Sequence, residues 1–345
     1  MSKNPDKPYF CTARRVNHST IKCIHDIGKT YNRAQSEKLV IDTDAGGDDA
    51  VAILLVLSAW AANDSNFEVV GITCTYGNTL ETNVEMNVLQ TLTIANMSQI
   101  PVYGGAQKPL TRNSTTDYFF GANGFGDFDF DEEITADVDR SKHAAVALVD
   151  LARKYRGELS VLAMGPLTNI AIAISLDPDF TRNVKRFYIM GGSVSGIGNF
   201  APGIEFNFAA DPESNFILFN STKGEPIFLL PWETTSVVGL PMKWRTEVLG
   251  SIDSRTMRFL NLVERKILAG SKMWGSADVM TATFMLWPHL ITKSIITNIT
   301  PVFDGAAKGA LLVDYRNRSG KRKNVEIMQN GDSQSLKPLL IKYFS

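Results

Sequence analysis

The sequence predicts an α/β fold with a mostly parallel open sheet and helices on both faces. Three observations support this prediction. Strand-like and helix-like segments alternate from Lys38 onward, and this order is typical of parallel sheets. The chain has 345 residues, of which 44% are hydrophobic, so it can bury a large core. Several aspartates follow the first strand-like run, and open α/β sheets place their sites at the carboxyl ends of strands.

The expected elements alternate in the order that this fold requires. Short apolar runs between polar residues predict strands, whereas longer apolar segments predict helices. The expected strands cover residues 39–43, 67–76, 159–164, 184–190 and 226–230. The expected helices cover residues 48–62, 80–97, 142–155 and 167–176.

Three other segments do not follow this alternation. Residues 1–36 are rich in Lys and Arg and have no sustained apolar period, which predicts a flexible extension. Residues 117–133 form a long loop with many Gly, Phe and acidic residues, and such loops are usually functional or disordered. Residues 311–315 and 324–328 flank a basic segment with a Ser319-Gly320 turn signal, which predicts an exposed β-hairpin with a solvated tip.

Composition limits the classes of function. The net charge of −1 gives no basis for binding nucleic acid, and no apolar run is long enough to span a membrane. The three cysteines predict free thiols, not a disulfide framework. The N-terminus has no apolar signal segment, so we expect a cytoplasmic protein. A secreted form stays open because N-x-S/T sequons occur at Asn17, Asn63, Asn96, Asn113, Asn220, Asn298 and Asn317.

Four carboxylates crowd together directly after the first expected strand. They belong to Asp42, Asp44, Asp48 and Asp49. Like charges at this spacing repel one another, and the hard cations Ca²⁺ and Mg²⁺ take oxygen ligands. The Ala45-Gly46-Gly47 link lets the backbone turn between strand and helix. One Asp here could be a helix cap, but four predict a metal site.

A haloacid-dehalogenase-like phosphatase is an alternative, because its nucleophile loop is also D-x-D. The Asp48-Asp49 pair that opens the helix argues against it. The segment instead resembles the inosine-uridine nucleoside hydrolase family, whose fingerprint is D-x-D-x-G-x-D-D-x-x-A. The matching positions are Asp42, Asp44, Gly46, Asp48, Asp49 and Ala52.

Four further segments resemble the same family, in the same order along the chain. A strand ends in Gly77-Asn78, and a G-P-L-T-N turn follows Met164. Residues 190–213 contain M-G-G, then Asn199, Glu205 and Asn207 at the family's spacing, then D-P-E. Asp278 opens a later apolar helix. The resemblance implies a Rossmann-like nucleoside hydrolase fold, with residues 37–345 as a single catalytic domain, and a homodimer or homotetramer.

The resemblance also implies an activity and a role for each matching residue. The activity is hydrolysis of the N-glycosidic bond of ribonucleosides to ribose and free base. The side chains of Asp44, Asp49 and Asp278 and the carbonyl of Met164 would hold Ca²⁺. Asp44 would be the general base, and Asp42 would orient the metal ligands. The ribose would be bound by Asp48, Asn78, Asn199, Glu205 and Asn207.

The sequence departs from the family where the leaving base is expected. Many relatives have His before the last metal Asp, where this chain has Ala277, and a second His near the position of Phe119-Phe120. The aromatic candidates for stacking on the base are Phe119, Phe120, Phe125 and Trp274, with Phe120 and Trp274 expected to bind substrate. Stacking predicts a purine preference. The missing His also leaves open a catalytically weak homologue that only binds nucleosides.

Overall fold

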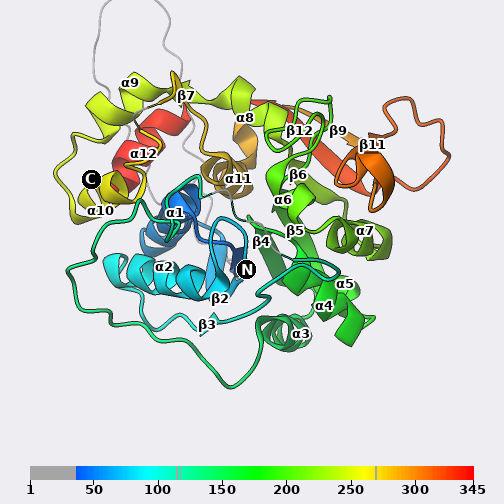
Figure 1. Cartoon of the computed structure of the whole chain (residues 1–345), viewed down its shortest axis with the longest axis horizontal. Helices are drawn as coiled ribbons and strands as arrows, with labels where there is room; N and C mark the ends of the chain where they lie inside the picture. The colour runs from blue at the N-terminus through cyan, green and yellow to red at the C-terminus, as the bar shows by residue number, and fades with distance from the viewer. Residues whose placement is uncertain (1–35, 114–115, 117, 269) are drawn as a thin grey trace, which may run out of the picture. The chain divides into compact units, whose positions relative to one another are not determined.

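A central eight-stranded sheet organises the computed structural model, which describes residues 36–113, 116, 118–268 and 270–345. The strand order is β3-β2-β1-β4-β5-β6-β12-β9, and only the β12–β9 pair within this sheet is antiparallel. Helices cover both faces of the sheet (Figure 1). The predicted fold class is therefore confirmed.

The sheet contains β1 (Glu37–Thr43), β2 (Phe67–Cys74), β3 (Val102–Tyr103), β4 (Leu159–Ala163), β5 (Val184–Met190), β6 (Ile227–Leu230), β9 (Ile291–Thr297) and β12 (Val325–Gly331). Two small antiparallel pairs are β7 (Leu240–Pro241) with β8 (Met273–Trp274), and β10 (Ile299–Pro301) with β11 (Leu311–Val313).

The α-helices are α1 (Gly47–Ala61), α2 (Glu81–Ile94), α3 (Ala144–Lys154), α4 (Thr168–Leu176), α5 (Phe180–Asn183), α6 (Phe206–Ala210), α7 (Pro212–Ser221), α8 (Trp232–Val238), α9 (Met242–Trp244), α10 (Arg255–Val263), α11 (Ala277–Leu286) and α12 (Leu336–Phe344). A π-helical turn covers Arg245–Leu249, and 3₁₀ turns cover Pro288–Leu290 and Gly305–Ala307.

Alternation along β1 divides the core into two layers. Leu39 and Ile41 belong to the core layer that includes α1, α2, α10, α11 and α12, whereas Val40 belongs to the layer that includes α3, α4 and α7. Successive strand residues point to opposite faces, so a strand buried on both sides is a continuous apolar run. Helix α1 is buried on nearly all sides because it contacts the sheet, α11 and α12.

The strand order reverses between β1 and β4, which are adjacent although α1, β2, α2, β3 and α3 separate them in sequence. Ligands bind at such switch points, outside the carboxyl ends of the strands. The chain segments after β1, β2, β4, β5 and β6 all emerge at this edge because these strands are parallel. The predicted site segments therefore meet there.

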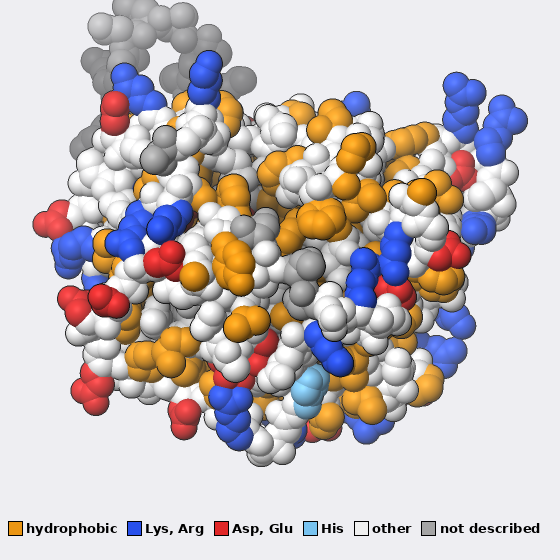
Figure 2. Space-filling view, viewed as in Figure 1, with side chains coloured by type: hydrophobic (Ala, Val, Ile, Leu, Met, Phe, Trp, Pro, Cys, Tyr) orange, Lys and Arg blue, Asp and Glu red, His pale blue; other side chains and the backbone are white. Residues whose placement is uncertain are grey.

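The predicted C-terminal hairpin is wrong. β11 pairs with β10, whereas β12 lies inside the central sheet between β6 and β9. Val325 and Ile327 of β12 are fully buried, so this strand belongs to the core and not to an exposed hairpin. The basic segment between β11 and β12 is exposed as expected, and its Lys and Arg side chains project from one corner of the view in Figure 2.

Some expectations concern the covalent state and the ends of the chain. Cys74 is a buried free thiol, whereas Cys11 and Cys23 lie outside the described residues. The expected N-terminal extension also lies outside them, apart from Ser36. In the part of the chain that the structure describes, no helix is both long and apolar enough to cross a membrane.

Candidate active site

The turn between β1 and α1 is built differently from the prediction. The residue in the left-handed region is Ala45, with φ of 30°, whereas Gly46 has an ordinary φ of −80°. The glycines serve close packing instead. A Cβ on Gly47 would lie 2.8 Å from Phe120 Cδ1, and a Cβ on Gly46 would overlap the Asn78 side chain. The two glycines therefore let Asn78 and Phe120 approach the start of α1.

Asp44 lies at the carboxyl end of β1 with one oxygen bound and the other without a partner. Its Oδ2 accepts a hydrogen bond from the backbone N–H of Asn78 at 2.8 Å. Its Oδ1 is buried and has no hydrogen-bond partner among the described residues. Burial and the charge of Asp49 raise the pKa of Asp44 well above its usual value. A buried, unpaired carboxylate oxygen is costly unless a ligand or proton joins it.

Asp42 is held by side chains from two other segments. Thr73 on β2 donates to its Oδ1 at 2.6 Å, and Asn169 on α4 donates to the same oxygen at 2.9 Å. Burial raises the pKa of Asp42 to about 6, although these hydrogen bonds oppose the rise. Asn169 also donates to the Cys74 carbonyl and accepts from the Ala106 amide. Asn169 thus joins the carboxyl ends of β1 and β2 to the loop after β3.

Asp48, Asp49 and Asp278 bring three acidic side chains close together. One oxygen from each lies within 4.8 Å of the other two. Asp278 comes from the first turn of α11, whereas Asp48 and Asp49 come from the first turn of α1. Burial and neighbouring carboxylates raise the pKa of Asp48 to about 8 and that of Asp278 well above its usual value.

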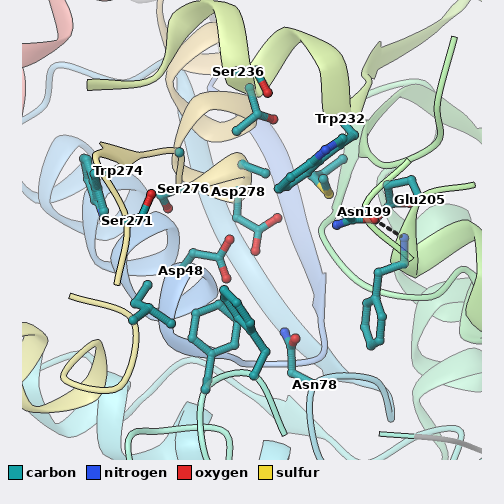
Figure 3. Close-up of a pocket in the computed structure, with 18 of the residues that line it drawn as sticks. Asp48, Asn78, Asn199, Glu205, Trp232, Ser236, Ser271, Trp274, Ser276 and Asp278 are labelled. Atoms are coloured by element: carbon teal, nitrogen blue, oxygen red, sulfur yellow. Dashed lines mark hydrogen bonds between the residues drawn. The ribbon is translucent and has the colours of Figure 1, made fainter. Parts of the chain in front are cut away.

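Asp49 is held more firmly than Asp48. Its oxygens accept from the Thr43 hydroxyl at 2.5 Å and from the Gly46 amide at 2.9 Å. Asn78 Nδ2 donates to Asp49 at 3.3 Å. Burial still raises the pKa of Asp49 to about 6. In Figure 3, Asp48 and Asp278 point toward each other at the centre of the pocket, with Asn78 below them. This set of oxygen donors suits a hard divalent cation.

Asn207 connects the loops after β4 and β5. Its Nδ2 donates to the Met164 carbonyl at 2.9 Å and contacts Met190 Sδ at 3.3 Å. A carbonyl oxygen has two lone pairs, so Met164 can accept this hydrogen bond and still ligate a cation. The predicted carbonyl ligand and the predicted ribose ligand therefore touch each other.

Glu205 and Asn199 also hold the backbone around the pocket. Glu205 is the N-cap of α6 and accepts from the amides of Asn207, Gly192 and Phe208 at 2.8–3.1 Å. Burial raises its pKa. Asn199 Oδ1 accepts from the Phe206 amide at 2.8 Å, the dashed line in Figure 3. Both residues line the pocket, so they position the loop and can contact a ligand.

Glu233 has a role that no sequence motif predicts. Its carboxylate accepts from the amides of Val194 and Ser195 at 3.0 and 2.7 Å, and from the Ser193 hydroxyl at 2.7 Å. The Ser195 hydroxyl and the Ile197 amide also donate to it. These hydrogen bonds lower the pKa of Glu233 although burial opposes them. One side chain on α8 therefore holds the glycine-rich loop that leads to Asn199.

One pocket of about 560 Å³ is lined by Asp48, Asn78, Met164, Asn199, Glu205, Asn207 and Asp278. Asp42, Asp44, Asp49 and Glu233 contact these segments but are not among the lining residues. Phe119 and Phe120 also line the pocket, and their rings meet edge to face at 4.9 Å. The candidate Phe125 does not line it, because Phe125 is fully buried against Phe259.

Trp232, which sequence reasoning missed, lines the pocket from the start of α8. Figure 3 shows Trp232 and Trp274 on opposite sides of Asp278.

Trp274 is fixed by a buried ion pair behind the pocket. Its indole nitrogen donates to Glu264 at 2.7 Å, and Glu264 pairs with Arg245 at 2.7 Å. All three residues are almost completely buried.

The described histidines, His143 and His289, are not among the pocket residues, and His143 accepts from the Ala145 amide at the start of α3. His18 and His25 lie outside the described residues.

An open α/β sheet whose carboxyl edge gathers aspartates and asparagines around one pocket is the architecture of a nucleoside hydrolase. The chain belongs to this family, since residues 39–337 match the family model "Inosine-uridine preferring nucleoside hydrolase". It is 36% identical to "Probable uridine nucleosidase 1" of Oryza sativa subsp. japonica over 187 residues, covering 54% of this chain and 56% of that protein. The chain thus spans little more than half the length of this curated relative.

Two further relatives match over most of their length. The chain is 28% identical to "Pyrimidine-specific ribonucleoside hydrolase RihA" of Enterobacter sp. (strain 638), over 88% of this chain and 96% of that protein. The solved structure of "Inosine-Guanosine Nucleoside Hydrolase (IG-NH)" superimposes with a TM-score of 0.81 at 25% identity, covering 89% of this chain and 98% of that one. The fold and the family are therefore established, and the phosphatase alternative is set aside.

Proposed function

We propose that residues 37–345 form a Ca²⁺-dependent ribonucleoside hydrolase that releases ribose and the free base. The observation that supports this most is the convergence of Asp44, Asp48, Asp49 and Asp278 with Asn78 and Asn207 at the carboxyl edge of the sheet. Carboxylates suit a hard cation, and carboxylates with amides suit the hydroxyls of a sugar.

Asp44, Asp49 and Asp278 would hold the Ca²⁺, together with the Met164 carbonyl. The unpartnered Oδ1 of Asp44 and the close approach of Asp49 and Asp278 fit such a ligand set. Asp48 lies close to both Asp49 and Asp278, since one oxygen from each of the three lies within 4.8 Å of the other two. It can therefore contact either the cation or the sugar bound beside it. When bound, the cation would lower the pKa of a water molecule and stabilise negative charge.

Asp44 would accept a proton from the attacking water. Its Oδ1 is buried and has no hydrogen-bond partner among the described residues, and a positioned carboxylate is a common general base. The Thr73 and Asn169 hydrogen bonds to Asp42 would keep this end of β1 in place. As the glycosidic bond breaks, the sugar would develop oxocarbenium character.

The ribose would be bound by Asp48, Asn78, Asn199, Glu205 and Asn207. The hydroxyls of a sugar both donate and accept, which matches a mixed set of carboxylates and amides. The arrangement leaves the aromatic side of the pocket for the base. We assign stacking on the base to Phe120 and Trp274, and we add Trp232 because it lines the pocket and is only partly buried.

The most specific part of this proposal concerns which base the enzyme prefers. The names of the relatives refer to uridine and pyrimidines as well as to inosine and guanosine. The pocket volume and the aromatic side chains around it favour a purine. Stacking is worth about 1–3 kcal/mol per base, and it raises the basicity of a purine, so that solvent can protonate the leaving base. Assembly as a homodimer or homotetramer is expected from the family and is testable by sedimentation.

A panel of nucleosides tests the proposed function. Pure protein with Ca²⁺ is incubated with inosine, adenosine, guanosine, uridine and cytidine, and ribose release is measured. We expect turnover of ribonucleosides, with a purine nucleoside as the best substrate. Uridine cleaved faster than every purine nucleoside would refute the purine preference. Tight binding without turnover would instead identify a nucleoside-binding homologue.

A further inference from the structure

The half of the pocket opposite Asn199 and Glu205 carries several hydroxyl groups. Thr235 and Ser236 lie on α8, Ser271 lies just before β8, and Ser276 lies between β8 and α11. Ser236 is exposed, so water can satisfy its hydroxyl. The Ser271 hydroxyl donates to the Met273 carbonyl at 2.8 Å within its own turn. Figure 3 shows Ser271 and Ser276 beside Trp274.

Thr235 and Ser276 differ from the other two. Their side chains line the pocket but are only 2% and 5% exposed. Neither hydroxyl oxygen has a hydrogen-bond partner among the residues that the structure describes. Buried polar atoms are nearly always paired, because an unpaired one costs free energy. Two such atoms in one wall of one pocket indicate that a ligand supplies the partners.

The local fold does not use these hydroxyls. Ser276 is the N-cap of α11 but makes no capping hydrogen bond, whereas Ser254, the N-cap of α10, accepts from the Met257 amide at 3.0 Å. Thr234, the neighbour of Thr235, donates its hydroxyl to the Met328 carbonyl at 2.6 Å. The hydroxyl of Thr234 is thus paired with the backbone of β12, whereas the side chain of Thr235 lines the pocket.

The position of the two hydroxyls suits the edge of a planar heterocycle. Ribose recognition occupies the side with Asn199, Glu205 and Asn207, and α8 carries both Trp232 and Thr235. A nucleobase presents ring nitrogens, N–H groups and carbonyl oxygens, and a hydroxyl can pair with any of them because it both donates and accepts. We propose that Thr235 and Ser276 determine specificity by hydrogen bonding to the edge of the nucleobase. This inference rests on the proposed function.

The test compares two leaving groups on the same sugar. The variants Thr235→Val and Ser276→Ala are assayed on the best ribonucleoside of the panel and on p-nitrophenyl β-D-ribofuranoside. The latter has no ring nitrogen or ring carbonyl. We expect kcat/KM for the ribonucleoside to fall by about tenfold or more in each variant. Activity on the p-nitrophenyl riboside should stay within about twofold of wild type, because the ribose half is intact.

Two controls separate base recognition from folding. Thr283→Val removes another buried, unpartnered hydroxyl, which lies on α11 but not in the pocket lining, and it should change neither rate. Thr235→Ser keeps the hydroxyl and should retain ribonucleoside activity. Equal losses on both substrates, or no loss on the ribonucleoside, would overturn the inference while the active wild type still supports the hydrolase. A wild type inactive on both substrates would overturn the proposed function and the inference together.

Discussion

Asp44 and Asp49 lie five residues apart, but their surroundings differ. Asp44 has one unpartnered oxygen, whereas Asp49 accepts several hydrogen bonds. Asp44→Asn keeps the size of the side chain and removes its charge. We expect kcat for ribonucleosides to fall by about 10²–10⁴-fold, the usual contribution of a general base. Steady-state kinetics at saturating Ca²⁺ measures this change.

Asp49→Ala should also abolish turnover, because it removes a proposed metal ligand. The matched control is Asp253→Ala. Asp253 is 91% exposed and pairs only with Arg258 in the described structure, and exposed pairs contribute little. Near-normal kcat in Asp49→Ala would remove the case for this metal site.

The crowded carboxylates predict how pH affects stability. Burial raises the pKa values of Asp42 and Asp49 to about 6 and that of Asp48 to about 8, from an ordinary value of 3.8. When the pKa of a carboxyl group is higher in the folded than in the unfolded state, its contribution to stability is fully present below the pKa of the unfolded state. That contribution is lost as the pH rises through the pKa of the folded state. Without metal, these groups therefore cost stability progressively between about pH 4 and pH 8.

Added Ca²⁺ should offset this loss, since it binds the charged carboxylates. We expect the rise in unfolding free energy on adding Ca²⁺ to be larger at about pH 8 than at about pH 5.5. Urea unfolding with chelator or with Ca²⁺, at both pH values, measures the difference. A Ca²⁺ effect that is equal at both pH values, or larger at the lower one, would contradict the metal-ligand assignment.

Residue spacing alone could predict only part of the site. The spacing of Asp42, Asp44, Asp48 and Asp49 is local, so it is visible in the sequence. Trp232, Glu233 and Thr235 form part of an ordinary polar-apolar segment. Trp232 and Thr235 reach the pocket, and Glu233 reaches the loop after β5, because β6 is parallel to β5 and ends at the same edge of the sheet. No local pattern carries that information.

At the scale of elements, the glycine-rich loop after β5 depends on α8. Glu233→Ala removes the acceptor for the amides of Val194, Ser195 and Ile197. Hydrogen bonds to a charged group are worth roughly 1.5–3 kcal/mol each, so the loop and Asn199 should lose their fixed position. We expect KM for ribonucleosides to rise about tenfold or more, with a smaller change in kcat.

The control for this variant is Glu247→Ala. Glu247 lies on the π-helical turn, and among the described residues it makes only an exposed ion pair with Lys243. Its removal should leave KM unchanged. An unchanged KM in Glu233→Ala would show that the loop holds its conformation without the carboxylate.

The sequence predicts helices and strands correctly where a continuous apolar run is buried. It predicts the wrong partner where a strand pairs with segments far away in the sequence. The strand at Val184–Met190 is as predicted, and the helix after β1 differs by one residue at each end. A turn signal between two apolar runs predicts a hairpin over residues 311–328. β12 instead pairs with β6 and β9. Strand pairing across such distances follows from core packing, which local periodicity does not show.

For the whole molecule, the ribose half of the pocket predicts selection between sugars. A site built to hydrogen-bond a hydroxyl leaves its own polar groups unpaired when that hydroxyl is absent. Asp48, Asn78 and Asn207 should therefore reject 2′-deoxynucleosides. We expect kcat/KM for 2′-deoxyadenosine to be about 10⁴-fold below that for adenosine. Equal values would show that these residues do not bind the 2′-hydroxyl.

Ribose release before and after removal of divalent cations is the most direct test of Ca²⁺-dependent nucleoside hydrolysis. The pure protein is assayed on its best ribonucleoside, then treated with a chelator, and then returned to Ca²⁺. We predict turnover in the first assay, loss of at least about 10²-fold in the second, and recovery in the third. Full ribose release in the chelated protein, or none in any state, would contradict the assignment of Asp44, Asp49 and Asp278 to a catalytic calcium site.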